Sequence, residues 1–280
     1  MADELTTYHE NTWCPGCGNF GLFNALKKAV LALEKNGTPR EKLIHTAGIG
    51  CHGKTFDYLA LSGFYSLHGR ALATAQGIKL ANPDLKVFSS VGDGDTIGEG
   101  LEHLIFAAKR NADITALIHN NGVYALTTGQ VTPVSERGFR GPSTPQGNPE
   151  DPLNALALLL EAGATFVARG YAGKVDHLAG LMVRAVEHEG FSYVEILQPC
   201  VSFNNTYDKY NKLTEIMARE PATFEEAMAA VKRKDRLPLG VFYEVKKKPY
   251  HLEVQGDRNP ATERIPRDQR IERVRKLLQG

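Results

Sequence analysis

The chain has 280 residues and a formal net charge of +1, with 42% hydrophobic and 23% charged residues. This length can form one large α/β domain or two small ones with a sizeable core, and the composition argues against a disordered chain. A net charge this small shows no excess of basic residues of the kind that indicates nucleic acid binding.

The N-terminal segment and the apolar stretches indicate where the protein works. The first residues, Met-Ala-Asp-Glu, are acidic and contain no apolar signal core. The longest apolar stretch, Leu156–Val167, is interrupted by Glu161 and is too short to span a membrane. We therefore expect a cytoplasmic protein that binds neither nucleic acid nor membranes. Four cysteines in an intracellular chain indicate metal ligands or redox groups rather than structural disulfides.

Strand-like runs alternate with helical patterns along the chain. The predicted strands are Lys42–Gly48, Val87–Gly92, Ile114–Asn120, Ala164–Gly170 and Ser192–Gln198. The predicted helices are Arg70–Ala81, Leu101–Arg110, Pro152–Glu161 and Val175–Glu189. This alternation predicts an α/β fold, a mostly parallel sheet with helices on both faces. Such sheets bind ligands at the carboxyl ends of their strands.

The domain organisation follows from the distribution of charge. Residues 1–249 form the predicted ligand-binding domain, and residues 250–280 form a charged C-terminal tail. The sequence is already dense in charge from about Lys232, and we interpret that region as a solvated surface rather than a partner-binding arm. The Gly- and Pro-rich residues 129–152 predict a long ordered loop.

Two polar motifs follow predicted strands and suggest a magnesium site. Gly-Asp-Gly-Asp begins at Gly92, and 25 residues separate its second glycine from the Asn-Asn pair that opens with Asn120. Asp93 can supply a carboxylate, Asn121 a side-chain carbonyl and Val123 a backbone carbonyl, with diphosphate oxygens as further ligands. The glycines allow close approach to phosphates, and a helix beginning near Thr96 would offer free N–H groups. The pair looks like the thiamine diphosphate motif; two ordinary turns after strands are the alternative.

The four cysteines can be interpreted in several ways. Cys14 and Cys17 have chelating spacing in Trp-Cys-Pro-Gly-Cys-Gly, whereas Cys51 and Cys200 each follow a predicted strand. Four thiolates are what a [4Fe–4S] cluster needs. Structural zinc accepts the same ligands, although usually as two close pairs. A thioredoxin-like dithiol and buried, inert cysteines also remain open.

The loop that contains Cys51 also matches a dinucleotide-binding pattern. Gly48-Ile-Gly-Cys-His-Gly53 follows a predicted strand, but no acidic residue for a ribose stands about 20 residues later. We interpret the loop as one wall of the thiamine site, with Cys51 binding a cluster. His52 and His68 could contact a diphosphate, or could be hydrogen-bonded structural residues.

The combination of motifs resembles one family. WCPGCG, GIGCHGK, HGRALATAQGIKLANP, GDGDTIGEGLEH, NNGVYALTTGQ and QPC are similar to segments of 2-oxoacid:ferredoxin oxidoreductase β subunits, and the likeness runs from about Trp13 to Pro249. The resemblance implies a thiamine diphosphate-binding fold with a [4Fe–4S] cluster on Cys14, Cys17, Cys51 and Cys200. It implies Mg²⁺ on Asp93, Asn121 and the Val123 carbonyl. It places thiamine diphosphate against Ile49, Gly50, Cys51, His52, His68, Gly94, Asp95, Ala125 and Leu126.

The resemblance also implies an activity. It is the coenzyme A-dependent oxidative decarboxylation of a 2-oxoacid to acyl-CoA and CO₂, reversible in principle, with electrons passing through the cluster to ferredoxin. The GIGCHGK form is more similar to 2-oxoglutarate or broad 2-oxoacid enzymes than to dedicated pyruvate enzymes. Thr128 departs from the family, since many relatives have lysine there. The family's activating glutamate comes from a separate α subunit, so we expect activity only in an αβ or (αβ)₂ complex.

Other functions remain open at this stage. Pyruvate or broad-specificity oxidation is the alternative within the family. A non-enzymatic zinc- or cluster-binding α/β scaffold, or a thiamine decarboxylase or synthase without iron, would need no ferredoxin. Lys54 follows the Cys51 loop, so we predict that it points toward the thiamine pocket and binds the substrate carboxylate; a surface lysine is the alternative.

Overall fold

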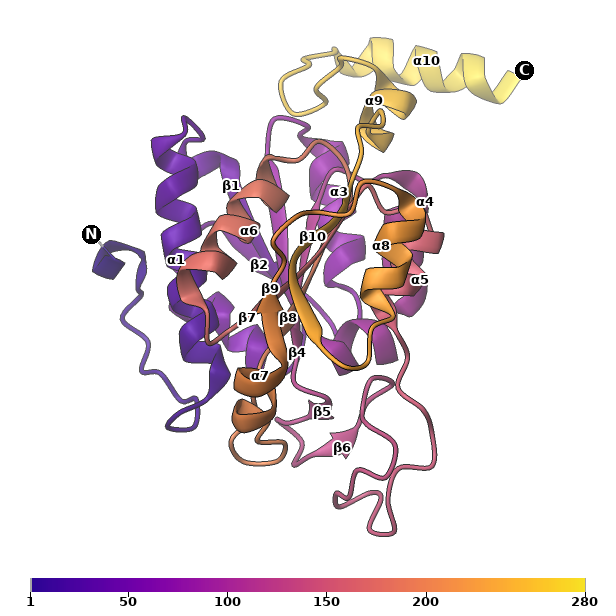
Figure 1. Cartoon of the computed structure of the whole chain (residues 1–280). Helices are drawn as coiled ribbons and strands as arrows, with labels where there is room; N and C mark the ends of the chain where they lie inside the picture. Colours follow the sequence, from indigo (N-terminus) through magenta and orange to yellow (C-terminus); the bar gives the residue numbers. More distant parts are fainter. Residues whose placement is uncertain (1, 280) are drawn as a thin grey trace.

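An eight-stranded sheet forms the centre of the protein, in the computed structural model that describes the backbone of residues 2–279 and the side chains of residues 4–279 (Figure 1). Its strand order is β2-β1-β3-β4-β8-β7-β10-β9. The strands are β1 (Leu43–Ala47), β2 (Gly63–Tyr65), β3 (Lys86–Gly92), β4 (Thr115–Asn120), β7 (Phe166–Tyr171), β8 (Ser192–Leu197), β9 (Thr214–Ile216) and β10 (Leu237–Glu244). A separate two-stranded sheet consists of β5 (Val123–Tyr124) and β6 (Gln130–Val131).

The sequence prediction of a mostly parallel α/β sheet is confirmed. The five predicted strands correspond to β1, β3, β4, β7 and β8, and every pairing among these strands is parallel. The strands are buried on both faces, as is typical of a sheet that helices cover on both sides. The four predicted helices also form, as α3 (Ala71–Ala81), α4 (Leu101–Arg110), α5 (Ala155–Glu161) and α6 (Val175–Glu187).

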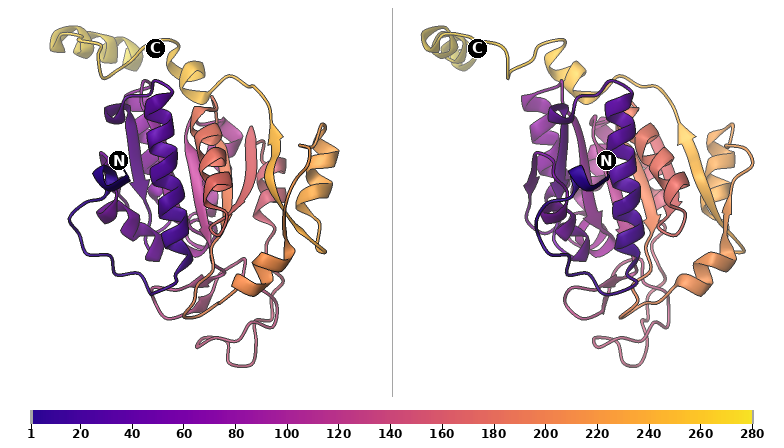
Figure 2. Two further views of the ribbon diagram at one scale, coloured as in Figure 1. Left: turned by 60° about the vertical axis from the view of Figure 1, so that its left-hand side comes forward. Right: turned by 90° about the vertical axis from the view of Figure 1, so that its left-hand side faces the viewer.

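Two hydrophobic layers lie on opposite faces of the sheet. On one face α1 (Gly18–Lys35) and α6 pack against strand residues such as Leu117; the two views of Figure 2 show α1 running alongside the strands. On the other face α3, α4, α5 and α8 (Phe224–Val231) pack against residues such as Ala116 and Ile118. Adjacent residues of β4 therefore serve different layers, as the alternation of side chains along a strand requires.

Short helices complete the chain. The 3₁₀ helices are η1 (Ala2–Leu5), η2 (Arg40–Lys42) and η3 (Cys51–Lys54), and η4 (Gly94–Gly98) is a π-helix. The remaining α-helices are α2 (Thr55–Tyr58), α7 (Tyr207–Leu213), α9 (Tyr250–Gln255) and α10 (Arg267–Gln279). The helix predicted to begin near Thr96 is thus displaced: a π-helical turn occupies that position, and α4 begins only at Leu101.

The interpretation of the sequence from Lys232 as solvated surface was wrong for its middle part. Strand β10 pairs antiparallel with β7 inside the main sheet, and Leu239 and Phe242 are fully buried. Beyond it, α9 is tied to the body because the Tyr250 N–H donates to the Asn111 carbonyl at 3.0 Å. Helix α10 has no buried residue and projects beyond the sheet at the end opposite β5 and β6 (Figure 1). The domain boundary after residue 249 stays a prediction.

None of the helices in the described part of the chain combines the length and apolar character that a membrane crossing requires.

Candidate functional site

The two predicted magnesium motifs meet at the carboxyl edge of the sheet. β3 and β4 are parallel neighbours in which Gly92 lies opposite His119, so the residues that follow both strands emerge side by side. The Asn121 N–H donates to Asp93 Oδ1 at 3.3 Å, and Asn121 Oδ1 accepts from the Val123 N–H at 3.0 Å. The structure therefore brings together the three residues to which the sequence analysis assigned Mg²⁺.

Asp93 is a buried carboxylate without a cationic partner. Its side chain accepts a 2.6 Å hydrogen bond from Thr132 Oγ1, and no basic side chain in residues 4–279 forms an ion pair with it. Burial raises the pKa of Asp93 to about 6, although the Thr132 and Asn121 hydrogen bonds oppose this rise. A carboxylate in this setting is suited to a divalent cation, which would supply the missing positive charge.

Asp95 lies two residues further on and organises two histidines. Its Oδ1 accepts from the N–H groups of Ile49 at 3.1 Å and Gly69 at 2.8 Å and lies 3.0 Å from His68 Nδ1. Its Oδ2 lies 3.5 Å from His52 Nε2. Burial alone would raise the pKa of Asp95, but the nearby imidazoles of His52 and His68 outweigh this effect and hold the pKa below its ordinary value.

Asp95 also affects His68 in return. The Asp95 carboxylate, 3.0 Å from His68 Nδ1, outweighs the opposing effect of burial and raises the pKa of the imidazole. The raised pKa favours a positively charged imidazole. His68 is more than one third exposed, whereas Asp95 is buried, so the charged group of the pair that is accessible is the imidazole. Such a group can contact an anion.

Glycines at this edge leave room that side chains would fill. A Cβ on Gly48 would lie 1.8 Å from Asp95 Oδ2, and a Cβ on Gly94 would lie 2.4 Å from the Tyr124 ring. At Gly50, which has a φ of 149°, a Cβ would meet the His52 imidazole. Close packing against Asp95, His52 and Tyr124 therefore requires glycine in the loop before Cys51 and at Gly94.

One cavity, which we call the carboxylate cavity, gathers these groups. It is lined by Ile49, Gly50, Cys51, His52, His68, Gly92, Asp93, Gly94, Asp95, Asn121, Val123, Tyr124, Ala125, Leu126 and Thr127. Every predicted thiamine contact and every predicted Mg²⁺ ligand lines it. Tyr124, Thr127 and Thr132 were not among the predicted site residues. Tyr124 and Thr127 are sequence neighbours of predicted residues, whereas Thr132 directly follows β6 and no local pattern pointed to it.

All four cysteines line a second cavity, which we call the cysteine cavity. Cys14 and Cys17 come from the loop before α1, Cys51 from η3, and Cys200 from the segment after β8. The Cys17 N–H donates to the Cys14 carbonyl at 2.9 Å, and the Cys200 N–H donates to the Asn204 carbonyl at 3.1 Å. The fold thus assembles thiols that are up to 186 positions apart in the chain, from Cys14 to Cys200.

The thiols influence one another electrostatically. Burial raises the pKa of Cys17 to about 11, and the neighbouring Cys200, Cys51 and Cys14 raise it further, against a hydrogen bond from the Asn19 backbone N–H. Burial also raises the pKa of Cys51, which Lys54 partly opposes. Within residues 4–279 no three His, Cys, Asp or Glu side chains form a group that could hold one metal ion.

The two cavities adjoin each other. Cys51, Asn121, Ala125 and Leu126 line both of them. Lys54 lines only the cysteine cavity, where its Nζ donates to Thr12 Oγ1 at 2.8 Å. Its predicted role in binding a substrate carboxylate stays a prediction.

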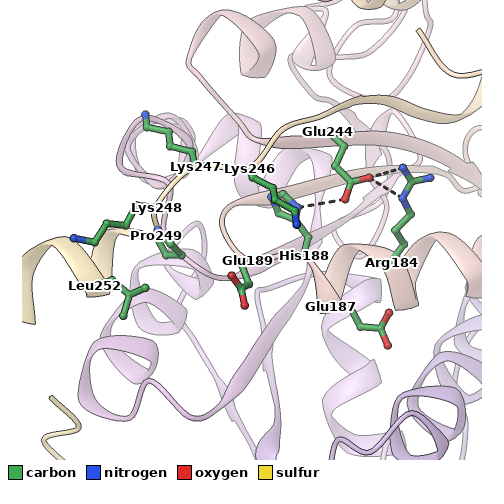
Figure 3. Close-up of a pocket in the computed structure, with 10 residues that line it drawn as sticks. All are labelled: Arg184, Glu187, His188, Glu189, Glu244, Lys246, Lys247, Lys248, Pro249 and Leu252. Atoms are coloured by element: carbon green, nitrogen blue, oxygen red, sulfur yellow. Dashed lines mark hydrogen bonds and ion pairs between the residues drawn. The ribbon is translucent and has the colours of Figure 1, made fainter. Parts of the chain in front are cut away.

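A third cavity, of about 670 Å³, lies at the other end of the sheet (Figure 3). Its residues come from the end of α6, the turn before β8 and the segment after β10. His188 Nδ1 lies 3.6 Å from Glu244 Oε1, and Arg184 Nε donates to Glu244 Oε2 at 2.8 Å. Arg184, His188 and Glu244 therefore pair with one another at one side of this cavity.

Comparison with known proteins adds independent information. Residues 48–196 match the family described as thiamine pyrophosphate enzyme, C-terminal TPP binding domain. Residues 200–257 match the family described as the C-terminal part of the pyruvate ferredoxin oxidoreductase beta subunit. A 2-oxoacid:ferredoxin oxidoreductase subunit beta from Sulfolobus is 41% identical over an alignment of 286 positions, which covers 95% of this chain and 93% of that protein.

Other relatives extend the likeness to proteins named for 2-oxoglutarate. A 2-oxoglutarate synthase subunit KorB from Archaeoglobus fulgidus is 40% identical and covers 71% of this chain and 73% of that protein. A solved structure of 2-oxoglutarate:ferredoxin oxidoreductase from Magnetococcus marinus, with 2-oxoglutarate, coenzyme A and succinyl-CoA bound, superposes with a TM-score of 0.90 at 33% identity. That match covers 98% of this chain and 95% of the solved chain.

Proposed function

Because the chain belongs to the family of 2-oxoacid:ferredoxin oxidoreductase β subunits, we propose that its two adjoining cavities hold thiamine diphosphate with Mg²⁺ and one [4Fe–4S] cluster. The observation that carries this proposal is the shared wall: Cys51 and Asn121 each line both the carboxylate cavity and the cysteine cavity. A site for decarboxylation and a site for electron storage would then be direct neighbours.

The carboxylate cavity fits thiamine diphosphate and Mg²⁺. Asp93 offers a buried carboxylate that lacks a cation, and Asn121 and Val123 offer oxygens beside it. His68, whose pKa Asp95 raises, offers a positive charge to a diphosphate. Oxygen donors of this kind together with phosphate oxygens are the ligands that Mg²⁺ prefers.

The cysteine cavity fits an iron–sulfur cluster. Four thiols surround one space, and a [4Fe–4S] cluster is held by four thiolates, each bound to a different iron. Structural zinc would require all four sulfurs at about 2.3 Å from one ion. The proposal of a cluster is supported by one cavity that all four thiols line and by the family to which the chain belongs.

The residues of the chain would serve the reaction chiefly by binding and orientation. Bound thiamine diphosphate would supply the electron sink for decarboxylation, and the cluster would accept the electrons that are released. Asp93, Asn121 and Val123 would fix the diphosphate through Mg²⁺. Asp95 would keep the imidazoles of His52 and His68 oriented, since it lies within 3.5 Å of both. Leu126 and Ala125 would contribute apolar surface to the wall between the two groups.

The reaction would require further components. The carboxylates that line the carboxylate cavity are Asp93, which we propose binds Mg²⁺, and Asp95, which lies beside His52 and His68. As the family implies, the activating glutamate would come from an α subunit, in an αβ or (αβ)₂ complex. Ferredoxin would receive the electrons, and coenzyme A would receive the acyl group.

We propose 2-oxoglutarate as the preferred substrate. The relatives named for 2-oxoglutarate support this choice, and a solved relative binds 2-oxoglutarate, coenzyme A and succinyl-CoA. Pyruvate or a broad range of 2-oxoacids is compatible with the relatives named for 2-oxoacids. Thr128, the departure from the family's lysine, is exposed and lines neither cavity.

Anaerobic purification of the complex with its α subunit tests the proposal. We expect about four iron atoms and one thiamine diphosphate per β chain, with broad visible absorbance near about 400 nm. A colourless protein that contains zinc would favour a scaffold, and bound thiamine diphosphate without iron would favour a decarboxylase or synthase.

A further inference from the structure

Gln198 lies between the two cavities and contacts a predicted ligand of each. It follows β8 directly, is 1% exposed and lines the cysteine cavity. Its Oε1 accepts a hydrogen bond from Asn121 Nδ2 at 3.1 Å, and its Nε2 lies 3.6 Å from Cys17 Sγ as a donor. One buried amide therefore spans the distance from a predicted magnesium ligand to a predicted cluster ligand.

These contacts fix the direction in which the amide points. An amide nitrogen can only donate and an amide oxygen can only accept, so the hydrogen bond from Asn121 directs the Gln198 nitrogen toward Cys17. The same nitrogen donates to the Pro199 carbonyl at 2.8 Å, and the Gln198 backbone N–H donates to the Asn120 carbonyl at 2.9 Å. The side chain is thus held at both ends and has no freedom to turn.

We propose that Gln198 is a positioning residue that serves both cofactor sites at once. It holds the Asn121 amide with its oxygen available to the metal, and it donates an N–H···S hydrogen bond that stabilises the reduced cluster. This inference rests on the proposed function, since it requires a metal at Asn121 and a cluster at Cys17.

The effect on the cluster follows from charge. A reduced cluster carries one more negative charge than an oxidised one, part of it on the thiolate sulfurs, so an N–H donor stabilises the reduced form and raises the reduction potential. The effect is strengthened by the burial of Cys17, which is 9% exposed. Cys17 also receives the Asn19 backbone N–H at the start of α1. Loss of Gln198 should therefore shift the potential without abolishing cluster binding.

The variant Gln198→Met separates these effects, because methionine matches the length of glutamine but can neither donate to sulfur nor carry charge. In the reconstituted complex, EPR-monitored redox titration should show a more negative midpoint potential. We expect the reduced-to-oxidised ratio at the wild-type midpoint to fall about tenfold, which is about 59 mV for a one-electron couple. The Mg²⁺ concentration for half-maximal thiamine diphosphate binding should also rise about tenfold, as expected for one buried hydrogen bond.

Gln255→Met is the matched control. Gln255 is half-buried in α9, and its Nε2 donates to the Leu80 carbonyl at 3.2 Å, far from either cavity in sequence and in the fold. We expect neither readout to change in this variant. A change of equal size in both variants would show a general loss of packing and would overturn the inference.

The outcomes distinguish the inference from the proposed function. A cluster-loaded Gln198→Met variant with the wild-type midpoint overturns the inference, and so does a shift in only one of the two readouts. If the methionine variant fails to fold, Gln198→Leu also removes the donor without adding a charge, and an unchanged midpoint there overturns the inference as well. A wild-type complex that contains no iron would instead reject the proposed function, and the inference with it.

Discussion

Cys51 and Asn121 lie in the wall between the carboxylate cavity and the cysteine cavity, and each of them lines both. Cys51 comes from the turn after β1, whereas Asn121 follows β4, so the wall exists only because the order β1-β3-β4 brings those strand ends together. The rate of electron transfer falls with distance, and the shared residues keep the two cavities adjacent.

Replacing Cys51 with serine should remove one of the four cluster ligands. We expect loss of the low-temperature EPR signal of the reduced cluster and a fall in iron content, because a hydroxyl is a poorer ligand for iron than a thiolate. Circular dichroism should confirm that the variant is folded. Full iron content and unchanged oxidation rates in Cys51→Ser would show that the cluster assignment is wrong.

Replacing Asp93 with alanine should abolish cofactor binding while leaving the fold intact. Asp93 is the only charged side chain among the predicted Mg²⁺ ligands, and its loss should cost more than the roughly 10–100-fold that removal of an outer-shell partner costs. Mass spectrometry after desalting measures the retained thiamine diphosphate. Asp84→Ala is the control, since Asp84 is an exposed residue paired with Lys42. Equal thiamine content in both variants would contradict the assignment.

Lys54 tests the choice of substrate. If its ammonium group binds a substrate carboxylate, Lys54→Ala should lower kcat/KM by about one to two orders of magnitude, the loss expected for one charge-assisted contact. A larger effect on 2-oxoglutarate than on pyruvate would indicate contact with the distal carboxylate. Lys27→Ala is the control, because Lys27 Nζ also donates to a threonine hydroxyl but lines neither cavity. Unchanged steady-state kinetics with both acids would show that Lys54 does not bind substrate and only donates its hydrogen bond to Thr12.

The stability of the domain should depend on Asn111. This fully buried residue has a φ of 53°, donates to the carbonyls of Lys247 and Lys248, and accepts from Thr165 Oγ1 and the Phe191 N–H. Asn111→Ala would remove these hydrogen bonds and leave the buried Phe191 N–H without an acceptor, so we expect the free energy of unfolding to fall by about 3 kcal/mol.

Chemical denaturation measures this change, with Asn36→Ala as the control. Asn36 makes one exposed hydrogen bond to Glu187, and its loss should cost less than about 1 kcal/mol. Equal losses in the two variants would show that Asn111 does not hold the segment after β10 in place.

The central strands could be predicted from the sequence, because parallel strands that are buried on two faces have continuous apolar sequences. The positions of the Gly-Asp-Gly-Asp and Asn-Asn motifs could be predicted with them. Asp93 and Asn121 each follow such a run directly, so their meeting at one edge of the sheet could be expected. The hydrogen bond from Thr132 to Asp93 could not be predicted, since it spans 39 positions and depends on how the loop after β5 folds back. The same holds for Gln198, whose two partners come from different parts of the chain.

Two of the elements that were not predicted, α1 and β10, were missed for identifiable reasons. The predicted elements begin at Lys42 and omit α1, although Leu22, Leu26 and Leu33 recur at helical spacing. Cys17 at its N-cap makes no side-chain capping bond, so no start signal was present. Strand β10 contains Pro238 and Gly240, which argue against a strand interior, and charged residues precede it. Its burial is a consequence of tertiary packing against β7.

Coenzyme A-dependent reduction of ferredoxin or a viologen by 2-oxoglutarate tests the central claim most directly, with the chain assayed alone and then after addition of its α subunit. We predict no activity from the chain alone and substantial activity in the complex, because Asp93 is assigned to Mg²⁺ and Asp95 to the two histidines, and the family's activating glutamate comes from the α subunit. Substantial activity from the chain alone would contradict the role of the α subunit. A loaded complex that reduces no acceptor with any 2-oxoacid would contradict the account as a whole.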